Sequence, residues 1–186
     1  MHAATDESLV ARIAKGEQVA MQVLFARHNV RVFRFVLRYI RDEATAEDVV
    51  SDVFLDVWKQ AGRFEGRSAV STWLLGMARF KALSARRANK DTVDADDALA
   101  EHADDADTPE VEAQKRDKGA ALRACIDKLS SEHREIIDLV YYHEKPIKEI
   151  AEILKIPDNT VKTRMFYARK KLSELMSEAG IDRGWP

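Results

Sequence analysis

Apolar residues recur at the three- and four-residue spacing of an α-helix over residues 9–87, with no strand-like alternation. The longest such stretch, residues 17–40, predicts a broad stripe facing a core, made of Val19, Ala20, Val23, Leu24, Ala26, Val30, Phe33, Val36, Leu37 and Ile40. A second helix is predicted from about Glu43 to Gln60. After a loop between Gly62 and Gly66, a third follows from about Val70 to Ala88. The apolar residues of this third helix are Trp73, Leu74, Met77, Phe80 and Leu83. The first half of the chain therefore predicts three or four packed helices.

Residues 91–109 interrupt this pattern and predict a linker. The stretch is rich in Asp and Ala, lacks large aromatic residues and ends in Thr108-Pro109, so it cannot bury enough apolar surface to fold alone. Helical spacing resumes near Val111 and leads to a helix from His133 to Tyr142, with Ser130 or Ser131 as its N-cap. The lone cysteine, Cys125, lies on an apolar helix face and is expected to be a core residue.

The segment from Pro146 to Leu172 predicts a helix, a tight turn and a second helix. Pro146 suits a first helical turn, where its missing N–H costs nothing. The first helix has one apolar face, Ile156 can fill the turn, and residues 157–160 offer capping side chains; the apolar face comprises Ile147, Ile150, Ala151 and Leu154. In the second helix the inward positions are spaced four, three and four residues apart: Val161, Met165, Ala168 and Leu172.

The opposite face of that second helix is basic and aromatic. It comprises Lys162, Thr163, Phe166, Arg169 and Lys170, flanked by Arg164, Tyr167 and Lys171. A helix of this width fits the major groove of DNA, where Lys and Arg bond guanine edges or phosphates. The alternative is an amphipathic hairpin with a solvated outer side. The absence of acid between Thr160 and Ser173, together with two adjacent aromatic residues, favours DNA.

The net charge of −2 conceals a segregation of charge along the chain. Residues 1–90 carry a net +5, residues 91–110 a net −9 and residues 111–186 a net +2. Both parts predicted to fold are therefore mildly basic, and the linker carries the excess acid. No basic segment followed by an apolar core begins the chain, and no apolar run could span a bilayer, so a cytoplasmic protein is expected.

The helix-turn-helix resembles region 4 of the sigma-70-type transcription factors, because TVKTRMFYARKKL follows an IAEIL helix. The first half agrees independently. Residues 46–58 (AEDVVSDVFLDVW) are similar to region 2.2, and Phe64 with residues 71–74 (STWL) and 77–79 (MAR) resembles regions 2.3 and 2.4. Two matches in this order, joined by a short linker, indicate the extracytoplasmic-function group (group 4). The implied all-α fold has region 2 at 5–90, an acidic linker at 91–109 and region 4 at 110–180.

The resemblance implies that this chain directs RNA polymerase to promoters. Region 2.2 would bind core RNA polymerase through a row of carboxylates and nearby apolar residues, here Asp48, Asp52, Asp56, Phe54, Leu55 and Trp58. The alternative reading makes the acids a solvated face and the apolar residues core, which suits Phe54 or Leu55 better than Asp48 or Asp52. In the family the linker passes through cationic channels of the polymerase, although a solubilising tether would have the same composition.

The resemblance also divides promoter recognition between two surfaces. The minus-10 residues would be Arg63, Phe64, Arg67, Ser68, Trp73, Arg79, Lys81, Arg86 and Arg87, which bind the opened strand. Trp73 suits a core position better than a base platform. The minus-35 residues would be Asn159, Thr160, Lys162, Thr163, Arg164, Phe166, Tyr167, Arg169 and Lys170.

Two positions depart from the family pattern. Many relatives have Asn and Asp in the region 2.4 helix where this chain has Phe80 and Ser84, which bears on its minus-10 preference. The recognition turn often has Gly where Asn159 stands, and Asn tolerates left-handed backbone.

The family also implies an anti-sigma factor as a further partner, and a monomer when the chain is free of partners.

Three other classes of protein fit less well. An enzyme would need a catalytic or metal constellation, yet the five histidines are scattered, and no HExxH, CxxC or Gly-rich phosphate loop occurs, so no cofactor is expected. A dimeric repressor or activator would need a dimerisation or sensor domain, which the first half does not resemble. A protein-binding adaptor leaves the basic helix face unexplained. The ending Gly184-Trp185-Pro186 has no physical account, beyond the possibility that an exposed terminal Trp docks on a partner.

Overall fold

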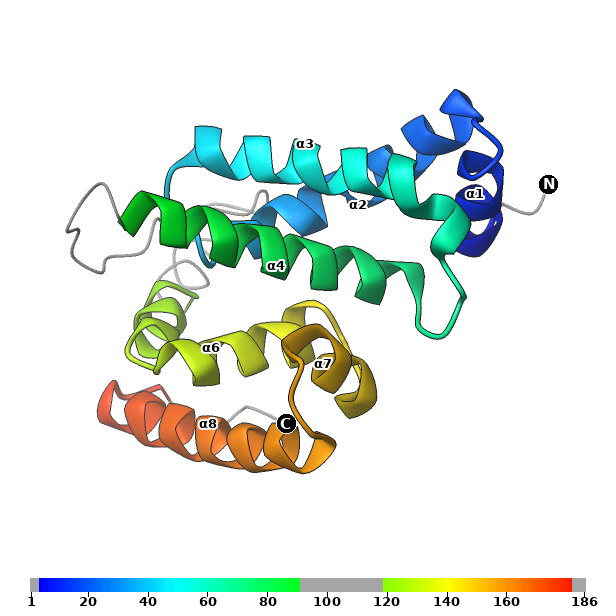
Figure 1. The fold of residues 1–186 in the computed structure, drawn as a ribbon. Coiled ribbons are helices and arrows are strands. Elements are labelled where there is room, and N and C mark those ends of the chain that lie inside the picture. Colours follow the sequence, from blue (N-terminus) through cyan, green and yellow to red (C-terminus); the bar gives the residue numbers. More distant parts are fainter. Residues whose placement is uncertain (1–3, 91–118, 182–186) are drawn as a thin grey trace, which may run out of the picture. The chain divides into compact units, whose positions relative to one another are not determined.

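The computed structural model describes residues 4–90 and 119–181, and this part of the chain contains helices and turns but no strand (Figure 1). The predicted linker and the Gly184-Trp185-Pro186 ending lie outside the described residues. The described helices fall into two compact units, the first made of α1–α4 and the second of α6, η2, most of α7 and α8. The all-α fold class predicted from the sequence is confirmed.

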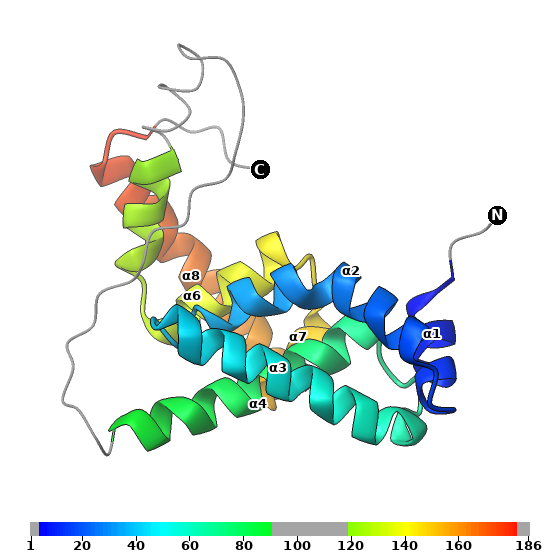
Figure 2. The same ribbon diagram turned by 90° about the horizontal axis from the view of Figure 1, so that it is seen from above.

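The first unit is built from α1 (Asp6–Ile13), α2 (Gln18–Val36), α3 (Glu43–Gln60), the short 3-10 helix η1 (Ala61–Arg63) and α4 (Val70–Lys90). Helices α2, α3 and α4 pack against one another in pairs, and α1 packs across α2 (Figure 2). The bounds of α3 agree with the prediction, whereas α2 ends four residues before the predicted stripe does.

The inward face of α2 is narrower than the predicted stripe. Its buried residues are Ala20, Leu24, Val32, Phe35 and Val36, while the predicted Val19 and Val30 are each 59% exposed. Val23 and Ala26 are exposed as well, so Val19, Val23, Ala26 and Val30 form a second apolar row on the solvent side. The prediction that the whole stripe faces a core is therefore wrong, because the sequence superimposes two apolar rows on one helix.

The apolar residues of α4 do not all face inward. Its buried residues are Val70, Leu74, Leu75, Ala78 and Ala82, whereas Phe80 is 73% exposed. Alanine packs closely between helices but gives a weak hydrophobic signal, so the apolar pattern of α4 does not by itself locate its inward face.

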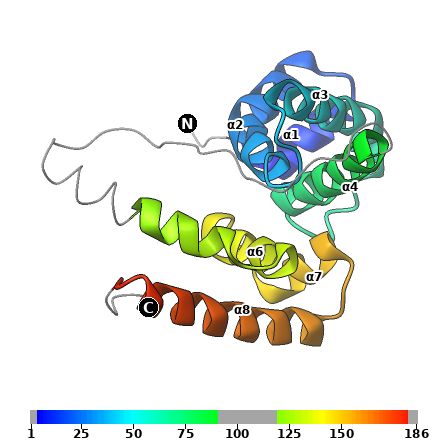
Figure 3. The same cartoon turned by 90° about the vertical axis from the view of Figure 1, so that its left-hand side faces the viewer.

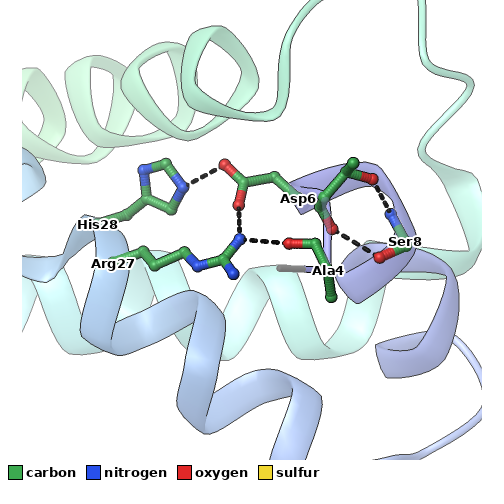
Figure 4. Close-up of polar contacts among 6 residues, drawn as sticks. Ala4, Asp6, Ser8, Arg27 and His28 are labelled. Atoms are coloured by element: carbon green, nitrogen blue, oxygen red, sulfur yellow. Dashed lines mark hydrogen bonds and ion pairs between the residues drawn. The ribbon is translucent and has the colours of Figure 1, made fainter. Parts of the chain in front are cut away.

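A polar clip fastens the start of the chain to α2 (Figure 4). The Asp6 carboxylate accepts a hydrogen bond from Arg27 Nη1 at 2.8 Å, and its other oxygen lies 2.6 Å from His28 Nε2. Arg27 also donates to the carbonyl of Ala4 at 2.7 Å. Burial raises the pKa of Asp6, but the hydrogen bonds and positive charges of Arg27 and His28 outweigh it and hold that pKa below its ordinary value.

The second unit holds α6 (Ser131–Ile137), the five-residue π-helical segment η2 (Asp138–Tyr142), α7 (Ile147–Leu154) and α8 (Asp158–Glu178), and residues 119–127 are helical as well. Ser130 caps α6 by accepting a hydrogen bond from the His133 amide at 3.3 Å, as predicted. Figure 3 shows α6 lying along α8. Their shared core includes Leu129, Ile137, Ala168, Leu172 and the buried thiol of Cys125, which confirms the expectation for that residue.

Candidate nucleic-acid interface

The turn between α7 and α8 is a C-terminal cap of the Schellman type. Lys155 adopts the left-handed conformation with φ 56°, and the Ile156 amide donates a hydrogen bond to the Ala151 carbonyl at 3.2 Å. Asn159, by contrast, lies inside the first turn of α8. The expectation that Asn159 supplies the left-handed residue of this turn is therefore wrong. The residue that does so is Lys155, four positions earlier.

The first turn of α8 has no side-chain cap. Its N-cap is Pro157, and the amides of Thr160 and Val161 bond back to the Pro157 carbonyl at 2.9 and 3.1 Å. The capping role expected of residues 157–160 is therefore wrong. The hydroxyl of Thr163 donates a hydrogen bond to the Asn159 carbonyl at 2.9 Å, which holds the Thr163 side chain against its own helix.

The two faces of α8 separate as the sequence predicts. Val161 and Ala168 are fully buried, Leu172 is 3% exposed and Met165 is half-buried. The outward residues Lys162, Thr163, Arg169 and Lys170 are exposed, together with Phe166 and Tyr167. We call this set the basic face of α8.

Two contacts orient the basic face. The guanidinium of Arg169 lies 5.6 Å from the centroid of the Tyr141 ring, a cation–π geometry, and the rings of Phe166 and Tyr167 meet edge to face at 5.4 Å. Phe166 remains 63% exposed and Tyr167 54% exposed. Large aromatic surface presented to solvent beside cations provides both apolar contact and charge for a nucleic acid.

Arg164 forms an ion pair within the unit. Its Nη2 atom lies 3.0 Å from Glu132 Oε1, at the start of α6, and its side chain is 25% exposed. This ion pair joins α8 to α6, so Arg164 links the two helices as well as adding charge. Among the predicted minus-35 residues, Asn159 is exposed and Thr160 is half-buried.

A buried polar pair that the sequence analysis missed lies just before α7. The π-helical segment η2 places Asp138 Oδ2 3.4 Å from His143 Nε2, and both side chains are at most 6% exposed. The His143 ring also packs edge to face on Tyr142 at 4.9 Å. The sequence signal was a polar residue at an otherwise apolar helix position. The backbone amide of His143 also donates a hydrogen bond to the Asp138 carbonyl at 3.1 Å, across the π-helical segment.

The outer face of α3 carries the predicted acidic row in part. Asp48 and Asp52 are exposed, and Leu55 follows on the same face with 49% of its surface exposed. Trp58 is 37% exposed at the edge of this face. Phe54 is 3% exposed, with its ring 4.8 Å from that of Phe25, so it belongs to the core of the unit. Asp56 Oδ2 lies 2.8 Å from Lys81 Nζ and faces α4.

The predicted minus-10 residues lie in η1, in the loop after it and along α4. The rings of Phe64 and Trp73 lie 4.9 Å apart with an interplanar angle of 36°, and both residues are half-buried. Arg63, Arg67, Arg86 and Arg87 are exposed, Arg67 next to Glu65 in an ion pair, while Ser68 and Arg79 are half-buried. Trp73 is therefore half-buried and in tilted ring contact with Phe64, between the core position and the open base platform that the sequence analysis weighed.

The described residues offer neither a metal site nor a membrane-spanning helix. Within residues 4–90 and 119–181, no group of three or more His, Cys, Asp or Glu side chains is arranged to hold a metal ion. In the same part of the chain, no helix is long and apolar enough to cross a membrane.

Comparisons with protein families place both units in one group. Residues 24–101 match the family described as Sigma-70 region 2, and residues 119–172 match Sigma-70, region 4. The ECF RNA polymerase sigma factor SigL of Mycobacterium tuberculosis is 31% identical over 180 residues, covering 94% of this chain and 98% of that protein. The RNA polymerase sigma-H factor of Pseudomonas aeruginosa is 28% identical over 187 residues, covering 94% and 97% respectively.

Solved structures show the same fold. The structure of CnrH in complex with the cytosolic domain of CnrY matches with a TM-score of 0.66 and 24% identity, covering 93% of this chain and 97% of that chain. The sigma factor RpoE in complex with the anti-sigma factor NepR from Bartonella quintana matches with a TM-score of 0.65 and 22% identity, covering 84% and 96%.

Proposed function

This chain belongs to the ECF RNA polymerase sigma factors, and from that premise we propose which of its faces performs each step of promoter recognition. A sigma factor of this family directs promoter-specific initiation of transcription by RNA polymerase and is an initiation factor rather than an enzyme by itself. The chain therefore has two macromolecular partners, core RNA polymerase and promoter DNA, and its work with the polymerase places it in the cytoplasm.

The basic face of α8 reads the minus-35 duplex, and the observation that carries this assignment is its unmixed charge. Lys162, Arg169 and Lys170 are exposed beside Phe166 and Tyr167, and no acid lies between Thr160 and Ser173 to repel phosphates. A helix of this diameter enters the major groove, where its cations bond guanine edges and phosphates. Arg164 supports this face through Glu132 rather than serving as a primary contact.

The exposed part of α3 binds core polymerase. Asp48, Asp52 and Leu55 share one outward face, and Trp58 lies at its edge, so the face combines charge with apolar surface, as a specific protein interface does. Phe54 supports the helix from inside, and Asp56 is engaged by Lys81. The proposed polymerase contact is therefore narrower than the predicted row of carboxylates.

The outer side of α4 and the loop at residues 63–68 bind the opened minus-10 strand. The tilted ring pair of Phe64 and Trp73 offers an aromatic edge, and Arg63, Arg86 and Arg87 offer exposed cations for the phosphates. Single-stranded DNA binding generally combines these two elements. In this proposal residues 5–90 bind the polymerase and open the promoter, residues 91–109 connect, and residues 110–180 read the duplex.

Run-off transcription tests the proposal most directly. Purified core polymerase is supplied with genomic promoter fragments and either the wild-type chain, Lys162→Ala/Arg169→Ala, or the charge-matched control Lys15→Ala/Arg31→Ala, whose two side chains are exposed in the first unit. Initiation that depends on the protein, is reduced at least tenfold by the α8 double substitution and is kept by the control supports the assignment. Equal initiation by both double variants would overturn the assignment of α8.

We propose further that an anti-sigma factor holds this chain inactive. The support is by analogy, since RpoE from Bartonella quintana was solved with the anti-sigma factor NepR. Co-purification of the tagged chain from its own cell with one stoichiometric partner that blocks run-off transcription would support this. Quantitative recovery of the chain in complex with polymerase alone, under all growth conditions, would contradict it.

A further inference from the structure

Phe80 is the most exposed large apolar residue among those that the structure describes, with 73% of its surface open to solvent. It lies in the middle of α4, a well-formed helix of 21 residues, so its exposure does not result from a frayed end. An exposed aromatic ring gains none of the hydrophobic stabilisation that its burial would give. A polar residue at the same position would leave no apolar surface in water. The position therefore invites a functional explanation.

The neighbours of Phe80 form a continuous track along α4. Trp73, Met77, Phe80, Ser84 and Arg87 are spaced four, three, four and three residues apart, which places them on one face of the helix. Trp73 and Met77 are half-buried, whereas the later three residues are exposed. Gly76 lies on the same side, and a Cβ atom added there would meet no other atom within 4 Å, so the surface beside Phe80 is open.

The charge of α4 selects the kind of partner that this track fits. No acidic residue occurs between Val70 and Lys90, and Arg86 and Arg87 are exposed cations of that helix, whereas Lys81 is paired with Asp56. An exposed ring next to exposed cations suits a nucleobase and its phosphate, because the cations bind the backbone and the ring stacks on the base. A protein partner would be selected more readily by charges of both signs.

The residue one turn after Phe80 is not arranged to read a base edge with its hydroxyl hydrogen. The Ser84 hydroxyl donates a hydrogen bond to the Phe80 carbonyl at 2.9 Å, so its proton is used within the helix. Phe80 itself has no polar atom in its side chain. At Phe80 the chemistry available for a base is stacking, and Ser84 retains only the acceptor capacity of its hydroxyl oxygen.

We propose that Phe80 is a platform on which one unpaired base of the opened promoter strand stacks, and that it makes the chain tolerant of base identity at that position. The inference rests on the proposed function of α4 in minus-10 binding and adds the residue that sets its specificity. Phe80 and Trp73 lie two turns apart, about 10 Å along the helix, so the Phe64–Trp73 pair and Phe80 meet different nucleotides. Every base has a π-face, which is why a stacking contact discriminates weakly among bases.

The test combines substitutions in the protein with single missing bases in the DNA. Holoenzyme is assembled from core polymerase and the full chain as wild type, Phe80→Ala, Phe80→Leu or Phe80→Trp. Its affinity is measured for a promoter fragment whose non-template strand is single-stranded through the minus-10 segment, with each base replaced in turn by an abasic site. Val30→Ala, at a residue that is 59% exposed on α2, is the control for removing exposed apolar surface.

Phe80→Ala is expected to weaken binding about 5- to 150-fold, the range that loss of one stacked base produces. One abasic position should weaken wild-type binding by a similar factor and have no further effect on Phe80→Ala, because both changes remove the same contact. Phe80→Trp should retain affinity, and Phe80→Leu should lose most of it. Substituting the four bases in turn at that position should change wild-type affinity by less than threefold.

Two failures can be distinguished. If wild-type holoenzyme binds the fragment and initiates while Phe80→Ala matches it at every abasic position, the platform is refuted and the proposed function stands. Loss of affinity by Phe80→Ala that adds to every abasic site would also refute stacking, since no single base would be its partner. If the wild-type chain gives no binding of the single-stranded segment, the proposed function of α4 itself fails.

Discussion

Asp56 on α3 and Lys81 on α4 form an ion pair across the helix interface, with Oδ2 and Nζ 2.8 Å apart. Their side chains are 28% and 23% exposed, so the pair is partly shielded from water. The sequence assigns these residues to different surfaces, Asp56 to the polymerase and Lys81 to DNA. Each instead has its charge compensated by the other, which leaves Asp48 and Asp52 as the accessible carboxylates of that row.

This pairing predicts opposite consequences for two similar substitutions. Asp52→Asn should weaken binding to core polymerase several-fold, with no measurable loss of stability, because Asp52 is exposed. Asp56→Asn should lower the free energy of unfolding by up to about 1 kcal/mol, the value of a partly exposed ion pair, and should bind the polymerase normally. Fluorescence anisotropy with labelled chain and urea unfolding measure the two quantities.

Glu47→Gln supplies the matched control, since Glu47 is an exposed acid of α3 about 100° around the helix from Asp48. It should leave both polymerase affinity and stability unchanged. Weaker polymerase binding by Asp56→Asn than by Asp52→Asn would show that the whole row of carboxylates, and not its exposed part, makes the contact.

The number of phosphates that α8 neutralises can be measured from the salt dependence of DNA binding. The plot of log affinity against log salt concentration has a negative slope, and the magnitude of this slope decreases by about 0.9 for each phosphate contact removed. Lys162→Ala/Arg169→Ala should therefore reduce the magnitude of the slope by between about 1 and 2, depending on whether one of the cations contacts a base edge. A smaller change is expected from Arg164→Ala, because Arg164 is paired with Glu132. An unchanged slope for the double variant would remove α8 from the duplex contact.

The turn of the helix-turn-helix makes a stability prediction that separates two glycine substitutions. Lys155 has φ 56°, a conformation that strains side chains but not glycine, so Lys155→Gly should raise the free energy of unfolding by up to about 1 kcal/mol. Asn159 is helical, so Asn159→Gly should lower it by a few tenths of a kcal/mol. Thermal unfolding of the two variants measures the contrast. Stabilisation by Asn159→Gly alone would contradict the assigned turn.

That turn also shows where sequence reasoning falls short. The helix-turn-helix follows from local patterns, since its apolar spacing and Pro146 mark both helices directly. The position of the left-handed residue depends on where α7 ends. Helix ends are set by hydrogen bonds such as that between Ile156 and Ala151, which the residue types do not specify.

The outer faces were harder to predict than the inner ones for a different reason. The inward set of α8 follows from its spacing of four, three and four residues, whereas α2 and α4 carry apolar residues on two sides, and periodicity does not distinguish a core from a binding surface. The pattern therefore places Val30 in a stripe that faces a core, and it does not tell on which side of α4 Phe80 lies. The buried contact between Asp138 and His143 could not be predicted either, because these two side chains come together only where the helix becomes π-helical.

The clip at Asp6 predicts how stability depends on pH. The pKa of Asp6 is held below its ordinary value of 3.8, because the contacts with Arg27 and His28 outweigh the effect of burial. A depressed carboxyl pKa contributes stability that is fully present above the unfolded value and is lost as pH falls through the folded value. The wild-type chain should therefore exceed Asp6→Asn by about 1 kcal/mol at pH 7, and this difference should shrink below about pH 4.

Urea unfolding of wild type and Asp6→Asn at pH 7 and pH 3 measures this difference directly. Other carboxylates also protonate over this interval, but they do so in both proteins, so only the contribution of Asp6 survives the subtraction. Glu7→Gln, at the exposed neighbouring position, is the control for removing a carboxylate from the first turn of α1. A difference between wild type and Asp6→Asn that is equally large at both pH values would show that the clip stabilises through shape and not through charge.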